Sequence, residues 1–157
     1  MSAADGRPAP HASAYEIPVR YGDTDQMGVA YYANYLYWFE IARTEWLRAR
    51  GIEQHGMRES EDLVMAVRSM QVEFEGAARL DDVLESRLWL TGRRGASFSL
   101  AQELWRGGQC LLRAGVKIAC LHANAFRPRP LPPWLVAAIQ APTQPATTNQ
   151  AHGDAPR

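Results

Sequence analysis

The sequence predicts an α+β fold in which one antiparallel sheet of five strands covers a single long helix. Three observations lead to this prediction. Apolar residues recur at helical spacing over residues 35–50, apolar and polar residues alternate along the segments on either side, and glycine-containing turns separate the later segments. A lone apolar helix has to bury its surface against another layer, so the strands are expected to form one sheet around it.

The first strand is expected at residues 15–21, where apolar and aromatic residues alternate with polar residues or proline. An acidic loop follows. Asn34 is the predicted N-cap of a helix over residues 35–50, and Gly51 is a natural residue at its C-terminal end. The residues at helical spacing are Tyr35, Trp38, Phe39, Ala42, Trp46 and Ala49.

The remaining strands are expected after a polar connector, residues 52–62, which is long enough for a brief helix. Their predicted ranges are 63–75, 83–90, 96–106 and 109–121, and the last has the clearest alternation of apolar and polar residues. Residues 92–95 predict one hairpin turn and Gly107-Gly108 a second. Hairpin turns favour antiparallel pairing of these strands.

Length and composition fit one globular domain. The chain has 157 residues, of which 46% are hydrophobic, and we expect the folded unit at residues 15–140 with disordered tails at 1–14 and 141–157. The 17 basic residues balance 17 acidic ones, so no overall field favours nucleic acid or an anionic membrane. No apolar stretch approaches the roughly 20 residues of a membrane span, and no secretory signal is visible, so a cytoplasmic location is expected.

The two cysteines carry no redox or metal signal. Cys110 and Cys120 fall in the same predicted strand, about 30 Å apart in an extended chain, and cannot bridge each other. Neither has a Cys or His neighbour at zinc spacing, so both are expected to be buried packing residues. We expect neither a metal ion nor a cofactor.

An acidic loop directly before the helix carries the clearest chemical signal. Its residues are Asp23-Thr24-Asp25-Gln26-Met27-Gly28. The first turn of a helix has unpaired N–H groups and partial positive charge, so it can stabilise an oxyanion formed beside a carboxylate that acts as nucleophile or base. An ordinary turn followed by an N-cap fits the same residues equally well.

The acidic loop is one of three pieces of a longer pattern. They are the loop with its helix start, Asp23-Thr24-Asp25-x-x-Gly28-x-x-Tyr31-x-x-Asn34-Tyr35; the helix end Ala42-Arg43-Thr44-Glu45-Trp46-Leu47-Arg48; and the later Phe74 with Ala78-Arg79-Leu80-Asp81-Asp82. Over residues 15–135 the pattern resembles the hotdog-fold acyl-CoA thioesterases. More narrowly, it is similar to the 4-hydroxybenzoyl-CoA thioesterase family and its YbgC branch, which is associated with the Tol-Pal cell-envelope system.

The resemblance implies a fold, an activity and an assembly. The family fold is a five-stranded antiparallel sheet curled around one long helix, in agreement with the prediction from the residues. The implied activity is hydrolysis of an acyl-CoA to a free carboxylic acid and CoA. The implied assembly is a homodimer, or a dimer of dimers, in which two sheets pair edge to edge and the active sites lie at the interface.

The resemblance also implies roles for individual residues. Asp25 matches the catalytic acid of the family, and Asp23 matches a residue that supports the loop. The backbone N–H near Tyr32 matches the group that polarises the thioester carbonyl, with Gly28 and Asn34 completing the active-site loop. Many YbgC-branch members have His at the position of Tyr32, whereas 4-hydroxybenzoyl-CoA thioesterases have Tyr, so no histidine general base is expected.

The phosphates of CoA need cationic partners. Arg93 and Arg94 in the predicted hairpin, Ser97 just beyond it, and Arg127 are the candidates, and solvated turn arginines are an equally good reading of each one. The acyl group is expected near the aromatic residues Tyr31, Tyr35 and Trp38, where packing in the core competes as an explanation.

Other functions remain open from the sequence. Acyl carrier protein is an alternative to CoA as the acyl carrier. A hydratase of this fold would have His where this chain has Ala30, which speaks against that reaction. A non-catalytic module that binds acyl-CoA or acyl carrier protein at the cell envelope is the alternative from a different class. Glu40 and Glu45 on the helix are expected to pair with other charges rather than to catalyse.

Overall fold

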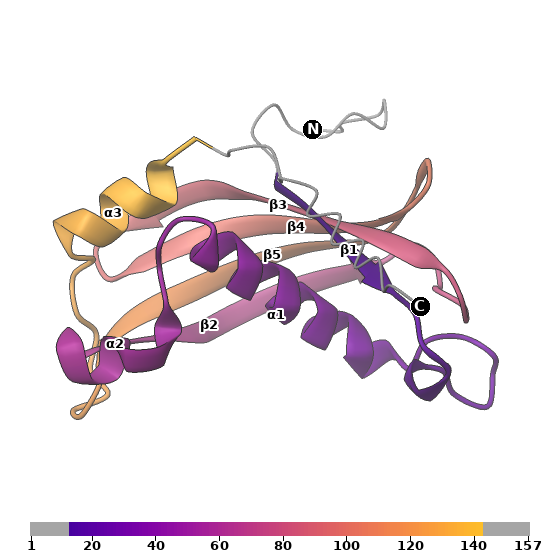
Figure 1. The fold of residues 1–157 in the computed structure, drawn as a ribbon, viewed down its shortest axis with the longest axis horizontal. Helices are drawn as coiled ribbons and strands as arrows, with labels where there is room; N and C mark the ends of the chain where they lie inside the picture. The colour runs from indigo at the N-terminus through magenta and orange to yellow at the C-terminus, as the bar shows by residue number, and fades with distance from the viewer. Residues whose placement is uncertain (1–12, 143–157) are drawn as a thin grey trace, which may run out of the picture.

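Five strands form one antiparallel sheet in the order β1-β3-β4-β5-β2, and the long helix α1 lies across one of its faces (Figure 1). The computed structural model describes residues 13–142. The strands are β1 (Ser13–Pro18), β2 (Leu63–Phe74), β3 (Val83–Arg94), β4 (Ser97–Arg106) and β5 (Gln109–His122), and the α-helices are α1 (Tyr32–Arg48), α2 (Gln54–Ser60) and α3 (Pro133–Gln140). The predicted α+β fold is confirmed.

The predicted tails fall mostly outside the described part of the chain. Residues 1–12 and 143–157 lie outside the described residues. The first strand, β1, begins at Ser13, two residues before the predicted start of the domain. The strand ends at Pro18 rather than at Tyr21 because the chain turns into the single 3₁₀ turn η1 (Tyr21–Asp23), where the Tyr21 side chain is 82% exposed.

Two hydrophobic clusters fill the space between α1 and the sheet. Phe39, in the first half of α1, belongs to a cluster that contains Leu84 and Leu104 of the sheet. Trp46, in the second half, belongs to a cluster that contains Phe98. Trp46 is 1% exposed, and the other four side chains are fully buried. The aromatic residues of the helix are therefore mainly core.

A buried polar pair lies between the two clusters. The Arg43 guanidinium of α1 donates to Gln102 Oε1 of β4 at 2.8 Å, and Gln102 Nε2 donates to the Phe39 carbonyl at 3.1 Å. Burial lowers the pKa of Arg43. These hydrogen bonds form only at one relative position of helix and sheet, so the pair fixes the position of α1 against β4.

One hairpin turn lies where the sequence predicts it, and the other does not. Arg106 pairs with Gln109, so Gly107-Gly108 is the confirmed two-residue turn. In the other hairpin, Arg94 pairs with Ser97, so β3 continues through residues 92–94 of the predicted turn and the chain reverses at residues 95–96. The register shifts just before Gly92, which is typical of a β-bulge and explains why a glycine lies inside the strand.

The predicted helix is correct in position and displaced at both ends. It begins at Tyr32 instead of Tyr35 and ends at Arg48 instead of Arg50. Gly51 is the stop signal that the sequence indicates: its φ is +73°, and the Ile52 N–H closes the helix end by donating to the Leu47 carbonyl at 3.0 Å.

The edge strand β2 contains a bulge that the sequence pattern does not reveal. The register with β5 shifts between Val67 and Ser69. Val67 and Met70 therefore lie on the face of the sheet that carries α1, and Ala66 lies on the opposite face. Val67 is 49% exposed and Phe74 is 55% exposed, although both lie opposite buried residues of β5. β2 pairs with no second strand among residues 13–142.

Two short helices close one end of the molecule. α2 lies within the predicted connector, and α3 occupies residues for which the sequence predicts no element. Proline at the first position of α3 fits a helix start, and Leu135 and Ile139 are buried in the same cluster as Trp46. No helix in the described part of the chain is long and apolar enough to cross a membrane.

Candidate active site

Asp23 stabilises the acidic loop through its side chain and its carbonyl. Its side chain accepts the Arg20 N–H at 2.8 Å, which closes the turn η1. Its carbonyl accepts two donors from the start of the helix, the Tyr31 N–H at 2.8 Å and the Asn34 side-chain amide at 2.8 Å. These contacts tie the beginning of the loop to the beginning of α1.

Asp25 lies half-buried at the turn of the same loop. Its N–H donates to the Val29 carbonyl at 2.9 Å, its carbonyl accepts the Gly28 N–H at 3.0 Å, and Oδ1 accepts the Met27 N–H at 2.8 Å. Gly28 has a φ of +77°, a left-handed conformation that glycine adopts without strain. Asp25 Oδ2 has no hydrogen-bond partner among residues 13–142, so one carboxylate oxygen is held and the other is open.

The start of α1 has no capping side chain. Tyr31 is the N-cap residue, a position that Ser, Thr, Asp or Asn usually occupies. The predicted N-cap, Asn34, is wrong: it lies in the first turn, and its amide donates to the Asp23 carbonyl instead. Within the described residues, the N–H groups of Tyr32 and Ala33 have no acceptor, so two donors point out of an electropositive helix start.

The three aromatic residues predicted for the acyl pocket lie in different surroundings. Tyr35 and Trp38 are each 3% exposed and pack edge to face with ring centroids 5.3 Å apart. Tyr31 is 47% exposed, and its ring lies 5.0 Å from that of Tyr32, which is 63% exposed. The structure therefore groups Tyr31 with Tyr32 at the helix start and places Tyr35 and Trp38 in the core.

The predicted CoA-binding residues lie at the other end of the sheet. Arg93, Arg94 and Ser97 line a groove of about 610 Å³ at the β3–β4 turn. Two further cationic residues, Arg68 and Lys117, line the same groove and were not predicted from the sequence. The position of Arg68 depends on the bulge in β2, which the sequence pattern does not reveal. Most of the other lining residues are small: Gly92, Gly95, Ala96, Ser99 and Ala119.

Arg127 lies beside this groove rather than in its wall. Its neighbour Pro128 is a lining residue and forms a β-bridge with Leu121, and the Arg127 carbonyl accepts the His122 N–H at 2.9 Å. Arg127 is exposed and directly precedes a residue that lines the groove. All four predicted CoA-binding residues gather in one region.

The two ends of the sheet are far apart within one chain. Val83 pairs with Pro18, close to the acidic loop, whereas Arg94 is the last residue of β3. At about 3.3 Å per residue, the 12 residues of this strand place its ends roughly 35 Å apart. Figure 1 shows the acidic loop at one end of the sheet and α3 at the other. We name these the loop end and the basic end.

Other polar residues make contacts that explain them without catalysis. Glu45 pairs with Arg48 at 2.6 Å, as predicted, whereas Glu40 accepts the uncharged Thr44 hydroxyl at 2.8 Å instead of pairing with a charge. Both cysteines are free, and burial raises the pKa of each thiol, in Cys110 to about 11. Residues 13–142 contain no cluster of three or more His, Cys, Asp or Glu side chains arranged to hold a metal ion.

Comparison with known proteins places this geometry in a family. The thioesterase-like superfamily model matches residues 19–139. The acyl-CoA thioesterase YbgC of Haemophilus influenzae is 36% identical over 129 residues, which cover 81% of this chain and 95% of that protein. The acyl-CoA thioester hydrolase YbgC of Escherichia coli O6:H1 is 38% identical over 133 residues, which cover 83% of this chain and 98% of that protein.

Solved structures agree with the sequence comparison. A probable thioesterase from Bartonella henselae has a TM-score of 0.73 at 31% identity, with 77% of this chain and 99% of that chain covered. A 1,4-dihydroxy-2-naphthoyl-CoA thioesterase from Synechocystis has a TM-score of 0.76 at 25% identity, with 82% of this chain and 95% of that chain covered. The hotdog fold is confirmed, and the chain belongs to the thioesterase-like superfamily.

Proposed function

We propose that this protein hydrolyses acyl-CoA thioesters to a free carboxylic acid and CoA, with Asp25 as the catalytic carboxylate. The observation that carries the proposal is a carboxylate with one open oxygen, held in a closed loop whose far stem enters a helix with no capping side chain. Relatives named as acyl-CoA thioesterases, matched over more than four fifths of the chain, support the same chemistry.

A thioester is activated enough for one carboxylate to start its hydrolysis, because sulfur donates electrons poorly into the carbonyl. In one route the open oxygen of Asp25 attacks the carbonyl carbon, the thiolate of CoA leaves, and water then cleaves the mixed anhydride. In the other route Asp25 takes a proton from water, and the water oxygen attacks directly. Both routes consume one water and release the acid and the thiol.

The start of α1 supplies stabilisation for the oxyanion in either route. The carbonyl oxygen gains negative charge as the tetrahedral intermediate forms. The N–H groups of Tyr32 and Ala33 lie at the electropositive helix end and are free to donate to it. The exposed rings of Tyr31 and Tyr32 flank these donors, which favours contact with the acyl group there.

A homodimer formed through β2 unites the two ends of the sheet. When two β2 edges pair antiparallel around a twofold axis, the strand directions reverse, so the basic end of one subunit comes to the same side as the loop end of its partner. The exposed Val67 and Phe74 become covered at such an edge. The Arg93 and Arg94 groove then holds the CoA phosphates while the partner's loop acts on the thioester.

The test of the catalytic carboxylate is Asp25→Asn. The variant keeps the acceptor for the Met27 N–H but loses the nucleophile or base, so kcat is expected to fall about 10²-fold or more, measured as thiol release from a panel of short, long and aromatic acyl-CoAs. Glu59→Gln, an exposed position on α2, is the matched carboxylate-to-amide control and keeps normal kcat. Normal turnover by folded Asp25→Asn contradicts the assignment.

The same panel separates the enzyme from the alternative of a non-catalytic binding module. Binding of acyl-CoA to the unmodified protein without thiol release from any member of the panel favours the module. Acyl carrier protein as the carrier, a dimer of dimers, a cytoplasmic location and the Tol-Pal association stay predictions.

A further inference from the structure

A strap of backbone between β2 and β3 lies against both stems of the acidic loop. The strap is residues 77–82, and the stems are residues 19–22 before the acidic loop and residues 29–31 after it. Just before the loop, the Val19 N–H donates to the Asp82 carbonyl at 2.9 Å. Near its end, the Ala30 N–H donates to the Ala78 carbonyl at 2.8 Å. The position of the strap therefore sets the position of both stems of the loop that carries Asp25.

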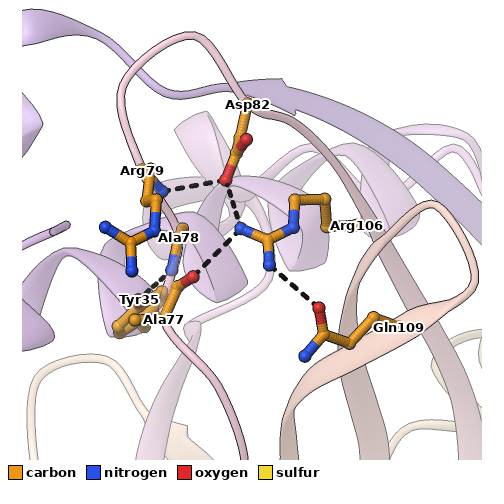
Figure 2. A network of polar contacts seen from close by, with 7 residues as sticks. All are labelled: Tyr35, Ala77, Ala78, Arg79, Asp82, Arg106 and Gln109. Atoms are coloured by element: carbon orange, nitrogen blue, oxygen red, sulfur yellow. Dashed lines mark hydrogen bonds and ion pairs between the residues drawn. The ribbon is translucent and has the colours of Figure 1, made fainter.

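Arg106, the last residue of β4, holds the strap from the sheet (Figure 2). Its Nη1 donates to Asp82 Oδ2 at 2.8 Å and to the Ala77 carbonyl at 3.2 Å, and its Nη2 donates to Gln109 Oε1 at 2.9 Å. The Arg79 N–H also donates to Asp82 Oδ2, at 2.8 Å. One guanidinium thus binds the strap at two points and a neighbouring strand at a third.

The ion pair is partly shielded from water. The side chains of Arg106 and Asp82 are 32% and 20% exposed. Burial alone raises the pKa of Asp82, but hydrogen bonds from Arg106 and from the Arg79 N–H outweigh it and leave the pKa below its ordinary value. The carboxylate is therefore charged at neutral pH, as the ion pair requires.

Tyr35 of α1 holds the strap from the helix. Its hydroxyl oxygen accepts the Ala78 N–H at 2.9 Å, with Tyr35 3% exposed and Ala78 fully buried. Ala78 thus binds the loop through its carbonyl and the helix through its N–H. Since the candidate oxyanion donors are at the start of α1 and Asp25 is in the loop, this residue links the two halves of the reacting geometry.

We propose that Arg106 and Asp82 are positioning residues for the thioesterase reaction: their ion pair fixes the strap, and the strap holds Asp25 in register with the start of α1. Neither residue has to touch the substrate. The inference rests on the proposed function, in which Asp25 is the catalytic carboxylate. Because the basic groove lies at the opposite end of the sheet, loss of the ion pair is expected to change kcat and not KM.

The kinetic test compares Arg106→Gln, Arg106→Lys and the control Arg48→Gln. Arg106→Gln is expected to lower kcat about 10- to 100-fold, the scale for a displacement near 1 Å at a reacting group, with KM within about twofold of normal. Arg106→Lys keeps a charge beside Asp82 and recovers part of kcat. Arg48→Gln removes the arginine of the exposed Arg48–Glu45 pair and leaves both constants unchanged.

Asp82→Asn removes the same ion pair from the carboxylate side. It is expected to lower kcat as Arg106→Gln does, and the double variant is expected to lose no more than the worse single variant, because both changes remove one interaction. Losses that multiply in the double variant contradict a shared action through the ion pair.

Amide hydrogen exchange measures how firmly the strap is held, independently of enzymatic turnover. In Arg106→Gln, or in Arg106→Lys if the former does not fold, the Ala30 and Ala78 amides are expected to exchange faster than in Arg48→Gln. The same increase is expected in the Asp25→Asn background, so failure of the catalytic assignment leaves this measurement intact. Unchanged exchange, or faster exchange with normal kcat in an Asp25-dependent enzyme, overturns the positioning role.

Discussion

The loop end and the basic end of the sheet are built from different interactions. At the loop end, backbone hydrogen bonds, one ion pair and a buried tyrosine hold Asp25 and the start of α1 in fixed relation. At the basic end, four cationic residues and several small ones line a groove; the cations are Arg68, Arg93, Arg94 and Lys117. The loop end fixes the positions of the groups proposed for catalysis, and the basic end concentrates positive charge.

This difference separates two tasks of a thioesterase. Chemistry on the carbonyl needs groups held within a fraction of an ångström, which polar networks with few alternatives provide. Retention of a phosphate-bearing leaving group needs electrostatic attraction, which exposed arginines provide. Changes at the loop end are therefore expected to act on kcat, and changes at the basic end on KM.

Tyr35→Phe is the largest expected change among three further tests. It removes the hydroxyl that accepts the Ala78 N–H and leaves that buried donor unpaired, which costs about 1–3 kcal/mol of the free energy of unfolding. kcat is expected to fall as well, with KM unchanged. Urea unfolding and steady-state kinetics measure both effects. Trp38→Phe, at a neighbouring buried aromatic residue that makes no hydrogen bond to the strap among the described residues, is the control. A kcat loss as large in this variant contradicts the special role of the hydroxyl.

Arg93→Ala/Arg94→Ala tests the basic end. With two phosphate partners removed, KM for acyl-CoA is expected to rise about tenfold, and its dependence on salt is expected to flatten while kcat is retained. Steady-state kinetics over a series of salt concentrations measures both effects. The control is Arg48→Gln on α1, which keeps the salt dependence. A fall in kcat with an unchanged KM contradicts the division between the two ends.

The Cys110 thiol gives the smallest test, of how closed the loop end is. Burial raises its pKa to about 11, so at pH 8 its thiolate fraction is about 10⁻³ and its rate with Ellman's reagent is expected to be roughly a hundredfold below that of an ordinary cysteine. The rate rises with pH because the reactive thiolate forms only as the pH approaches the pKa. Unfolding in urea restores fast reaction. Fast reaction of the folded protein at pH 8 contradicts a closed loop end.

The fold could be predicted from the sequence because its elements follow local rules. The helical spacing of Trp38, Phe39 and Trp46, the stop at Gly51 and the alternation in β5 each depend only on neighbouring residues. Errors arose where contacts distant in sequence decide. Asn34 is a good N-cap by propensity, but Asp23 offers its amide a carbonyl, and the helix starts three residues earlier.

The acidic loop could be proposed as a site from the sequence, but the residues that support it could not. Asp25 and Gly28 stand out from composition and spacing. Arg106, Tyr35 and Ala78 act through contacts between residues 24 to 48 positions apart in the sequence. The bulge at Arg68 and the groove that it lines also depend on segments distant in the sequence. No local pattern marks such contacts.

Subunit mixing tests the central claim most directly, namely that the loop end of one subunit acts with the basic end of its partner. Asp25→Asn dimers lack the carboxylate, and Arg93→Ala/Arg94→Ala dimers lack the groove cations. After subunits are exchanged at equal amounts, each mixed dimer has one site with both parts intact. At low substrate concentration the mixture is then expected to reach roughly a quarter of normal activity. Activity equal to the mean of the two parent variants contradicts the claim.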